Sequence, residues 1–140
     1  MNTGGRNRFD WGTMKYTLAF HSSSIQEDGQ FLYGGQPHGI ILEMGGKTFY
    51  HAGDTALFGD MKLIAQMHSL DIAALPVGDV FTMGPEDASI AAQWLGAKTY
   101  IPMHYNTFAP IQQDAEAWTK QLEAQSLQGI ALKPGESIQV

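Results

Sequence analysis

The chain has 140 residues, of which 44% are hydrophobic and 11% aromatic, and a formal net charge of −6. This length and composition are typical of one globular domain, so we expect residues 1–140 to form a single domain. The eight Lys and Arg residues are scattered along the chain. Clustered basic side chains are what bind phosphate backbones, so we expect no nucleic-acid partner. Cysteine is absent, which excludes disulfides and thiolate zinc sites.

The sequence contains no membrane-targeting pattern. No apolar run approaches the roughly 18 residues that a membrane span needs, and the glycine-rich start MNTGG does not follow the signal-peptide pattern. We therefore expect no membrane partner and a cytoplasmic location.

The first third of the chain is expected to be mostly strands. We expect a loop over residues 1–12, a strand over 13–20, and a loop over 22–37 with a short hairpin around Asp28-Gly29. Two β-branched or aromatic runs then flank Gly45-Gly46, which predicts a hairpin.

Helical patterns appear after residue 58. Apolar residues at helical spacing predict a helix over residues 59–68. The segment TMGPED at 82–87 is typical of a helix start, because proline fits the first turn and acids suit the positive end of the helix dipole. The remaining elements expected are strands at 71–77, 98–103, 130–132 and 137–140, a helix from 85 to about Gly96, and a helix over 114–125. Strands followed by strand–helix units indicate an α/β (α+β) fold, a mixed sheet with helices on one face.

Three short apolar runs each deliver one potential metal ligand to a polar turn. These ligands are His21, Asp54 and His104. Two imidazoles and a carboxylate at three strand ends suit a divalent cation such as zinc, manganese or iron. Each residue also has an ordinary structural reading. His21 could bond the neighbouring serines, Asp54 could cap a turn or helix, and His104 could be a loop histidine.

Four segments together resemble a known family: AFHSS at 19–23, YHAGDT at 50–55, GDVFTMGPEDA at 78–88 and PMHYNTF at 102–108. Residues 35–140 are similar to the C-terminal half of metal-dependent hydrolases of the metallo-β-lactamase superfamily, in the branch related to ascorbate-phosphate lactonases. The resemblance implies half of an αββα sandwich with one or two metal ions, Zn or Mn. It implies that His21 binds one metal, His104 the other, and Asp54 bridges both.

The activity implied is hydrolysis of an ester, lactone or phosphoester in a small-molecule substrate. Asp54 and His104 would be the catalytic residues, and two cations would activate a shared water. Such hydrolases also carry a His-x-His-x-Asp-His cluster in their N-terminal half. This chain has five histidines, no two of them separated by one residue. We therefore interpret it as a C-terminal half that begins within the fold.

Further residues could support the site. Asp79 could orient a metal-bound histidine, or equally close a turn ahead of a helix. Ser22, Thr55 and Asn106 could contact substrate. The residues Phe81, Met83 and Phe108 are expected to pack against other residues and not to recognise a ligand.

A second hypothesis assigns the chain no catalysis. A half-domain would expose apolar surface that normally packs on the other half, which invites association. It would then assemble as a homodimer, or other homo-oligomer, or pair with a complementing N-terminal half.

Overall fold

The computed structural model describes residues 1–139, and a six-stranded sheet organises them in the order β1-β2-β5-β6-β7-β8. Its strands are β1 (Arg6–Phe9), β2 (Gly12–Leu18), β5 (His38–Met44), β6 (Lys47–His51), β7 (Ile72–Pro76) and β8 (Thr99–Met103). Neighbouring strands from β1 to β6 are antiparallel, whereas β6, β7 and β8 are parallel. The expected mixed sheet is confirmed.

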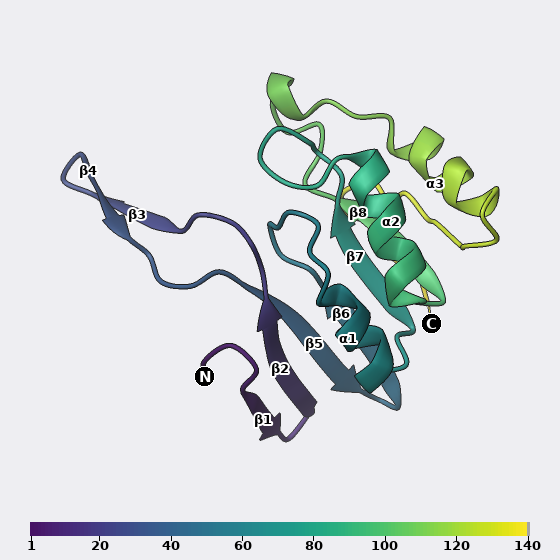
Figure 1. Ribbon diagram of the computed structural model, residues 1–140, viewed down its shortest axis with the longest axis horizontal. Helices are drawn as coiled ribbons and strands as arrows, with labels where there is room; N and C mark the ends of the chain where they lie inside the picture. Colours follow the sequence, from purple (N-terminus) through teal and green to yellow (C-terminus); the bar gives the residue numbers. More distant parts are fainter. Residues whose placement is uncertain (140) are drawn as a thin grey trace.

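Helices cover one face of this sheet, as expected. They are α1 (Met61–Met67), α2 (Pro85–Leu95) and α3 (Ala115–Glu123), with a short 3-10 helix η1 (Ala109–Ile111) between β8 and α3. Figure 1 shows α1 and α2 in front of the sheet. Helix α2 begins with Pro85 at its first turn and ends where Gly96 adopts the left-handed conformation. In α3 the Asp114 carboxylate accepts a hydrogen bond from the Ala117 N–H at 2.9 Å.

The hydrophobic core lies between the helices and the sheet. Ile41, Tyr50, Ala73 and Tyr100 point from neighbouring strands into this core, together with helix residues such as Leu95. Because strand residues alternate between faces, their neighbours in sequence point to the opposite side of the sheet. Among the described residues, no helix is long and apolar enough to cross a membrane.

A separate hairpin leaves the sheet between β2 and β5. It consists of β3 (Ser24–Glu27) and β4 (Gln30–Tyr33), joined by the expected turn at Asp28-Gly29. Figure 1 shows it projecting away from the body of the molecule. The predicted hairpin at Gly45-Gly46 also forms, and both glycines have the positive φ that its turn requires.

Two expectations at the ends of the chain are wrong. Residues 1–12 are not a loop throughout, because Arg6–Phe9 pairs with β2 as an edge strand. Residues 130–132 and the described part of 137–140 form no strand, while Val140 lies outside the described residues. In this region one isolated bridge joins Gly129 to Tyr100.

Candidate metal centre

The candidate ligands lie at one edge of the sheet. Strand β2 runs antiparallel to β5, and β5 antiparallel to β6, so β2 points the same way as β6, β7 and β8. The carboxyl ends of these four strands therefore lie at the same end of the sheet, which we call its carboxyl edge. His21 follows β2, Asp54 follows β6, Asp79 follows β7 and His104 follows β8. Ligands of open α/β sheets bind at this kind of edge.

Asp54 and His104 face each other across this edge. The His104 Nε2 lies 3.6 Å from the Asp54 Oδ2, and the two side chains are 27% and 45% exposed. The other ring nitrogen of His104, Nδ1, is buried and has no hydrogen-bond partner among residues 1–139. The pair is thus accessible to a small ligand on the Nε2 side only.

His21 lines the same hollow as this pair. The hollow has a volume of about 490 Å³, within the range of small-molecule sites. The His21 Nδ1 is 2.7 Å from the Ser22 carbonyl oxygen. This carbonyl can only accept a hydrogen bond, so in the neutral ring the Nε2 keeps its lone pair. Among residues 1–139, no group of three His, Asp or Glu side chains is close enough to hold a metal ion.

Backbone in left-handed conformations shapes this edge. Asp79, Val80 and His104 have φ values of 60°, 52° and 54°. Such values are uncommon outside glycine, and a β-branched residue like Val80 is an outlier there. Gly53, next to Asp54, has φ 69°, and a Cβ on it would lie 2.6 Å from the His38 carbonyl oxygen. Strained backbone of this kind concentrates at functional sites.

The other predicted residues mostly stabilise loops. Asp79 accepts a hydrogen bond from the Val80 N–H at 2.8 Å, so its carboxylate closes its own turn. Thr55 is fully buried, accepts from the Phe20 N–H and donates to the Ala56 carbonyl, so it does not face a substrate. Asn106 bonds both the N–H and the carbonyl of Gln113. Ser22 is exposed and lines the hollow.

The residues Phe81, Met83 and Phe108, which were expected to pack, do so in different places, and the Phe81 and Phe108 rings pack on each other with centroids 5.9 Å apart. Met83 is fully buried, as expected, but Phe81 and Phe108 line the hollow and are about half exposed. Phe20 and Val80 also line it, although no pattern in the sequence marks them as site residues. The outward position of Val80 follows from its left-handed φ of 52°, which the sequence pattern does not indicate.

His51 lies three residues before Asp54 and titrates under its influence. Burial lowers the pKa of the nearby His51, and the charge of Asp54 opposes that shift. The His51 Nδ1 accepts a hydrogen bond from the Gly53 N–H at 3.1 Å, which keeps the ring beside the Asp54 loop.

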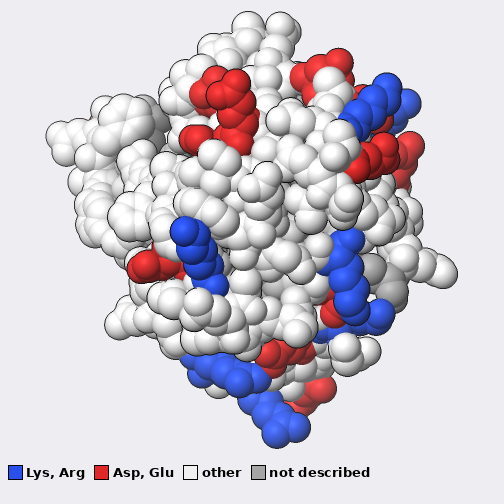
Figure 2. Space-filling view, turned by 45° about the vertical axis from the view of Figure 1, so that its right-hand side comes forward, with Lys and Arg blue, Asp and Glu red and all other residues white. Residues whose placement is uncertain are grey.

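On the face drawn in Figure 2, Lys and Arg side chains are interspersed with acidic ones and form no continuous basic patch.

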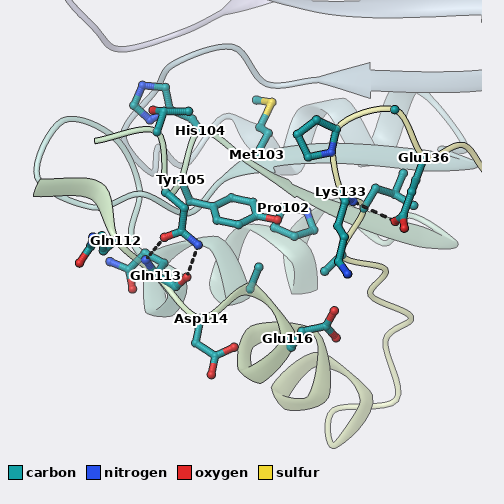
Figure 3. A pocket seen from close by; sticks show the side chains of 17 residues that line it. Pro102, Met103, His104, Tyr105, Gln112, Gln113, Asp114, Glu116, Lys133 and Glu136 are labelled. Carbon is teal, nitrogen blue, oxygen red and sulfur yellow. Dashed lines mark hydrogen bonds between the residues drawn. The ribbon is translucent and has the colours of Figure 1, made fainter. Parts of the chain in front are cut away.

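A larger groove of about 1280 Å³ lies beside the segment that follows His104. In Figure 3 the Tyr105 ring lies near Pro102, whereas the His104 ring points away from the Tyr105 ring. Burial raises the pKa of Tyr105, and Glu116 adds to the effect. The left-handed turn at His104 thus separates two neighbouring side chains. The Tyr105 side chain lies at the larger groove, whereas the His104 side chain faces Asp54.

Solved metallo-hydrolases share this fold. The structure of Igni18, a metallo hydrolase from the archaeon Ignicoccus hospitalis, superposes with a TM-score of 0.86 at 34% identity, over 99% of this chain and 58% of that protein. A crystal structure of a Parabacteroides distasonis protein superposes with a TM-score of 0.71 at 22% identity, over 94% of this chain and 56% of that one. The second likeness concerns the fold alone.

Sequence comparison defines the family. The profile of the beta-lactamase superfamily domain matches residues 1–105, and the chain belongs to this superfamily. It is 57% identical over its whole length to a UPF0173 metal-dependent hydrolase of Geobacillus thermodenitrificans and 54% identical to one of Thermus thermophilus. The chain spans 62% and 61% of the length of these two relatives.

Proposed function

We propose that this chain provides part of the active site of a metal-dependent hydrolase, with Asp54, His104 and His21 as ligands of a divalent cation, Zn or Mn. The observation that carries the proposal is the Asp54–His104 pair, with 3.6 Å between Oδ2 and Nε2, at the carboxyl edge of the sheet. The names of the relatives agree with this activity. The substrate would be a small molecule with an ester, lactone or phosphoester bond, and the location cytoplasmic.

The donor set fits a divalent cation of borderline hardness. One carboxylate and two imidazoles are the ligand types that zinc and manganese accept. The three side chains line one hollow, although only two of them are in direct contact. In such hydrolysis a bound cation makes water more nucleophilic and stabilises negative charge at the attacked centre.

Each residue of this chain has a defined task in the proposal. Asp54, the only carboxylate among the described residues that line the hollow, would offset part of the charge of the cation and would also serve a second cation where two are bound. His104 would bind through Nε2, because Nδ1 is buried. His21 would bind through Nε2, because Nδ1 faces the Ser22 carbonyl. The open side of the hollow admits the water and the scissile bond.

The metal content of the purified chain tests the proposal. After dialysis, inductively coupled plasma mass spectrometry should detect zinc, manganese or iron in near-stoichiometric amount. The variant Asp54→Ala should lose most of it, because the anionic ligand is removed. Asp60→Ala is the matched control, since Asp60 is exposed and its side chain makes no capping hydrogen bond. Negligible metal in the unmodified chain, or unchanged metal in Asp54→Ala, would contradict the proposal.

A specific observation also favours the second candidate function, assembly. The sheet face opposite the helices carries half-buried or exposed apolar side chains: Met14, Tyr16, Ile40, Leu42, Met44, Phe49 and Ile101. A contiguous apolar surface of this kind marks an interaction site. We propose that this bare face pairs with a second copy of the chain or with a complementing N-terminal half.

Light scattering coupled to size-exclusion chromatography tests the assembly. A clean monomer at 15.3 kDa would contradict pairing of identical chains. If the chain is oligomeric, Leu42→Glu on the bare face should shift it towards monomer. Leu63→Glu on α1 is the control, because Leu63 is an exposed leucine on the helical side. Equal effects of the two variants would contradict a role for the bare face.

A further inference from the structure

Apolar side chains surround the Asp54–His104 pair. They are Phe20, Val80, Phe81 and Phe108, which we call the apolar rim, and all four line the hollow that contains the pair. Their exposed fractions lie between 48% and 65%. Single exposed apolar residues need no explanation, but four of them around one polar pair form a patch with a ligand-binding character.

The apolar rim is held in place by its surroundings. The Phe81 and Phe108 rings come from different loops, and their centroids are 5.9 Å apart. The Phe20 ring lies 5.2 Å from that of Phe58. These aromatic contacts fix side chains that would otherwise move freely in solvent.

The loop that carries Val80 and Phe81 is strained and closed. Val80 has the left-handed φ of 52°, which a β-branched residue rarely adopts. The loop is closed where the Asp79 N–H donates to the Met83 carbonyl at 3.1 Å, and the Met83 N–H donates to the Thr55 carbonyl at 2.9 Å. These bonds tie the loop to the segment after Asp54, so the strain presents two apolar side chains beside the pair instead of burying them.

The charges of the residues that line the hollow restrict which substrate groups can bind beside the pair. Of the described residues that line the hollow, none is Lys or Arg. An anionic group on the flank of a substrate would therefore meet hydrocarbon and the Asp54 carboxylate, with no Lys or Arg side chain to pair with it. Burying an unpaired charge in such surroundings is unfavourable, whereas an apolar group gains by leaving water.

We propose that the apolar rim binds an uncharged aryl or branched alkyl group of the substrate, beside the bond that is hydrolysed. The proposal rests on the proposed function and deepens it. The apolar rim would favour neutral esters or lactones with a bulky apolar flank over substrates whose flanking groups are anionic.

A binding experiment on the metal-free chain tests the rim independently of the metal. The probes are acetanilide, which is neutral and stable, and phenyl phosphate, which carries the same ring with a charge. We expect acetanilide to shift the backbone amide resonances of residues 79–82 and 108 in a saturable way, and phenyl phosphate to bind at least about threefold more weakly. Loss of one ring from the rim in Phe81→Ala or Phe108→Ala should weaken acetanilide binding by about threefold to tenfold.

Two controls complete the test. Phe31→Ala removes the 74%-exposed phenylalanine of the β3–β4 hairpin, which does not line the hollow, and should leave binding unchanged. Phe81→Leu keeps an apolar side chain and should retain most of the affinity even if Phe81→Ala perturbs the loop. Shifts that avoid the rim, unchanged affinity in both alanine variants, or tighter binding of phenyl phosphate would overturn the inference. Metal content, measured separately, reports on the proposed function alone.

Discussion

The backbone of Gly78 packs directly against the carbonyl oxygen of His104. A Cβ added to Gly78 would fall well inside the contact distance of that oxygen, and 3.1 Å from the Cβ of Ile111. Beside this contact the Val77 N–H donates to the Met103 carbonyl at 3.1 Å. The ends of β7 and β8 are therefore joined at the point where the chain turns left-handed to aim His104 at Asp54.

Replacing Gly78 tests this junction. Gly78→Ala should lower the free energy of unfolding by about 1–3 kcal/mol, because the methyl group forces backbone to move. Urea denaturation followed by circular dichroism measures the loss. Gly59→Ala is the control, since a Cβ on Gly59 has nothing within 4 Å. Equal stability of the two variants would show that the junction tolerates a side chain.

Two buried tyrosines should respond differently to removal of their hydroxyls. The Tyr100 hydroxyl donates to the Ala92 carbonyl and accepts from the Ala97 N–H, both at 2.6 Å. Tyr100→Phe leaves the buried Ala97 N–H unpaired, whereas the Ala92 carbonyl keeps the hydrogen bond from the Gly96 N–H. The substitution should therefore cost about 1–3 kcal/mol. The Tyr50 hydroxyl is buried and has no hydrogen-bond partner in the part of the chain that the structure describes, although Thr17 is near it.

The variant Tyr50→Phe is therefore the matched control. It should be neutral or slightly stabilising, because it removes a polar atom that is not paired. Burial raises the pKa of each tyrosine to about 12, so both hydroxyls remain protonated at ordinary pH. Thermal unfolding at pH 7 compares the two. A larger loss in Tyr50→Phe than in Tyr100→Phe would contradict the hydrogen-bond assignment.

Elements with local signals were predictable from the sequence. The turn at Gly45-Gly46 needs positive φ at two successive residues, which glycine supplies, and the hairpin forms there. The start of α2 is encoded by Pro85 with Glu86 and Asp87 in the first turn. Strand β1 was missed because its sequence RNRF is polar, and its residues depend on pairing with β2 instead of burial.

The candidate site was predictable only in part. Strand ends and their ligand-type residues are visible in the sequence, and the sheet directions bring His21, Asp54 and His104 to one edge. The orientation of individual side chains was not predictable. Thr55 turns inward to bond Phe20, whereas Phe81 turns outward after the left-handed residues Asp79 and Val80. Such backbone reversals at non-glycine residues leave no mark in hydrophobic periodicity.

The stability of the sheet should depend on pH through Asp71. The Lys98 ammonium, 2.8 Å away, is the main cause that holds the pKa of Asp71 below its ordinary value of 3.8, and the Thr48 N–H contributes. A depressed pKa adds stability above the unfolded-state pKa, and this stability is lost as the pH falls through the folded-state pKa. Asp71→Asn should therefore lower the urea midpoint at pH 7, with a difference from the unmodified chain that shrinks below about pH 4.

The control for this prediction is Asp10→Asn. Asp10 is exposed in the turn between β1 and β2, and its carboxylate makes no hydrogen bond or ion pair with the described residues. The urea midpoint of the Asp10→Asn variant should equal that of the unmodified chain at each pH from 7 to 2.5. A constant difference between Asp71→Asn and the unmodified chain across that range would show that lost packing, and not the ion pair, explains the effect.

The β3–β4 hairpin should be the least protected part of the sheet structure. All eight of its strand residues are exposed, and its strands pair only with each other. A two-stranded hairpin is marginal in water without a supporting layer. Hydrogen exchange measured by NMR should show its amides opening with a free energy on the order of 1 kcal/mol or less, whereas those of β6 and β7 approach the global value. Strong protection of Phe31 and Tyr33 would contradict this expectation, and it would mean that another chain covers the hairpin in solution.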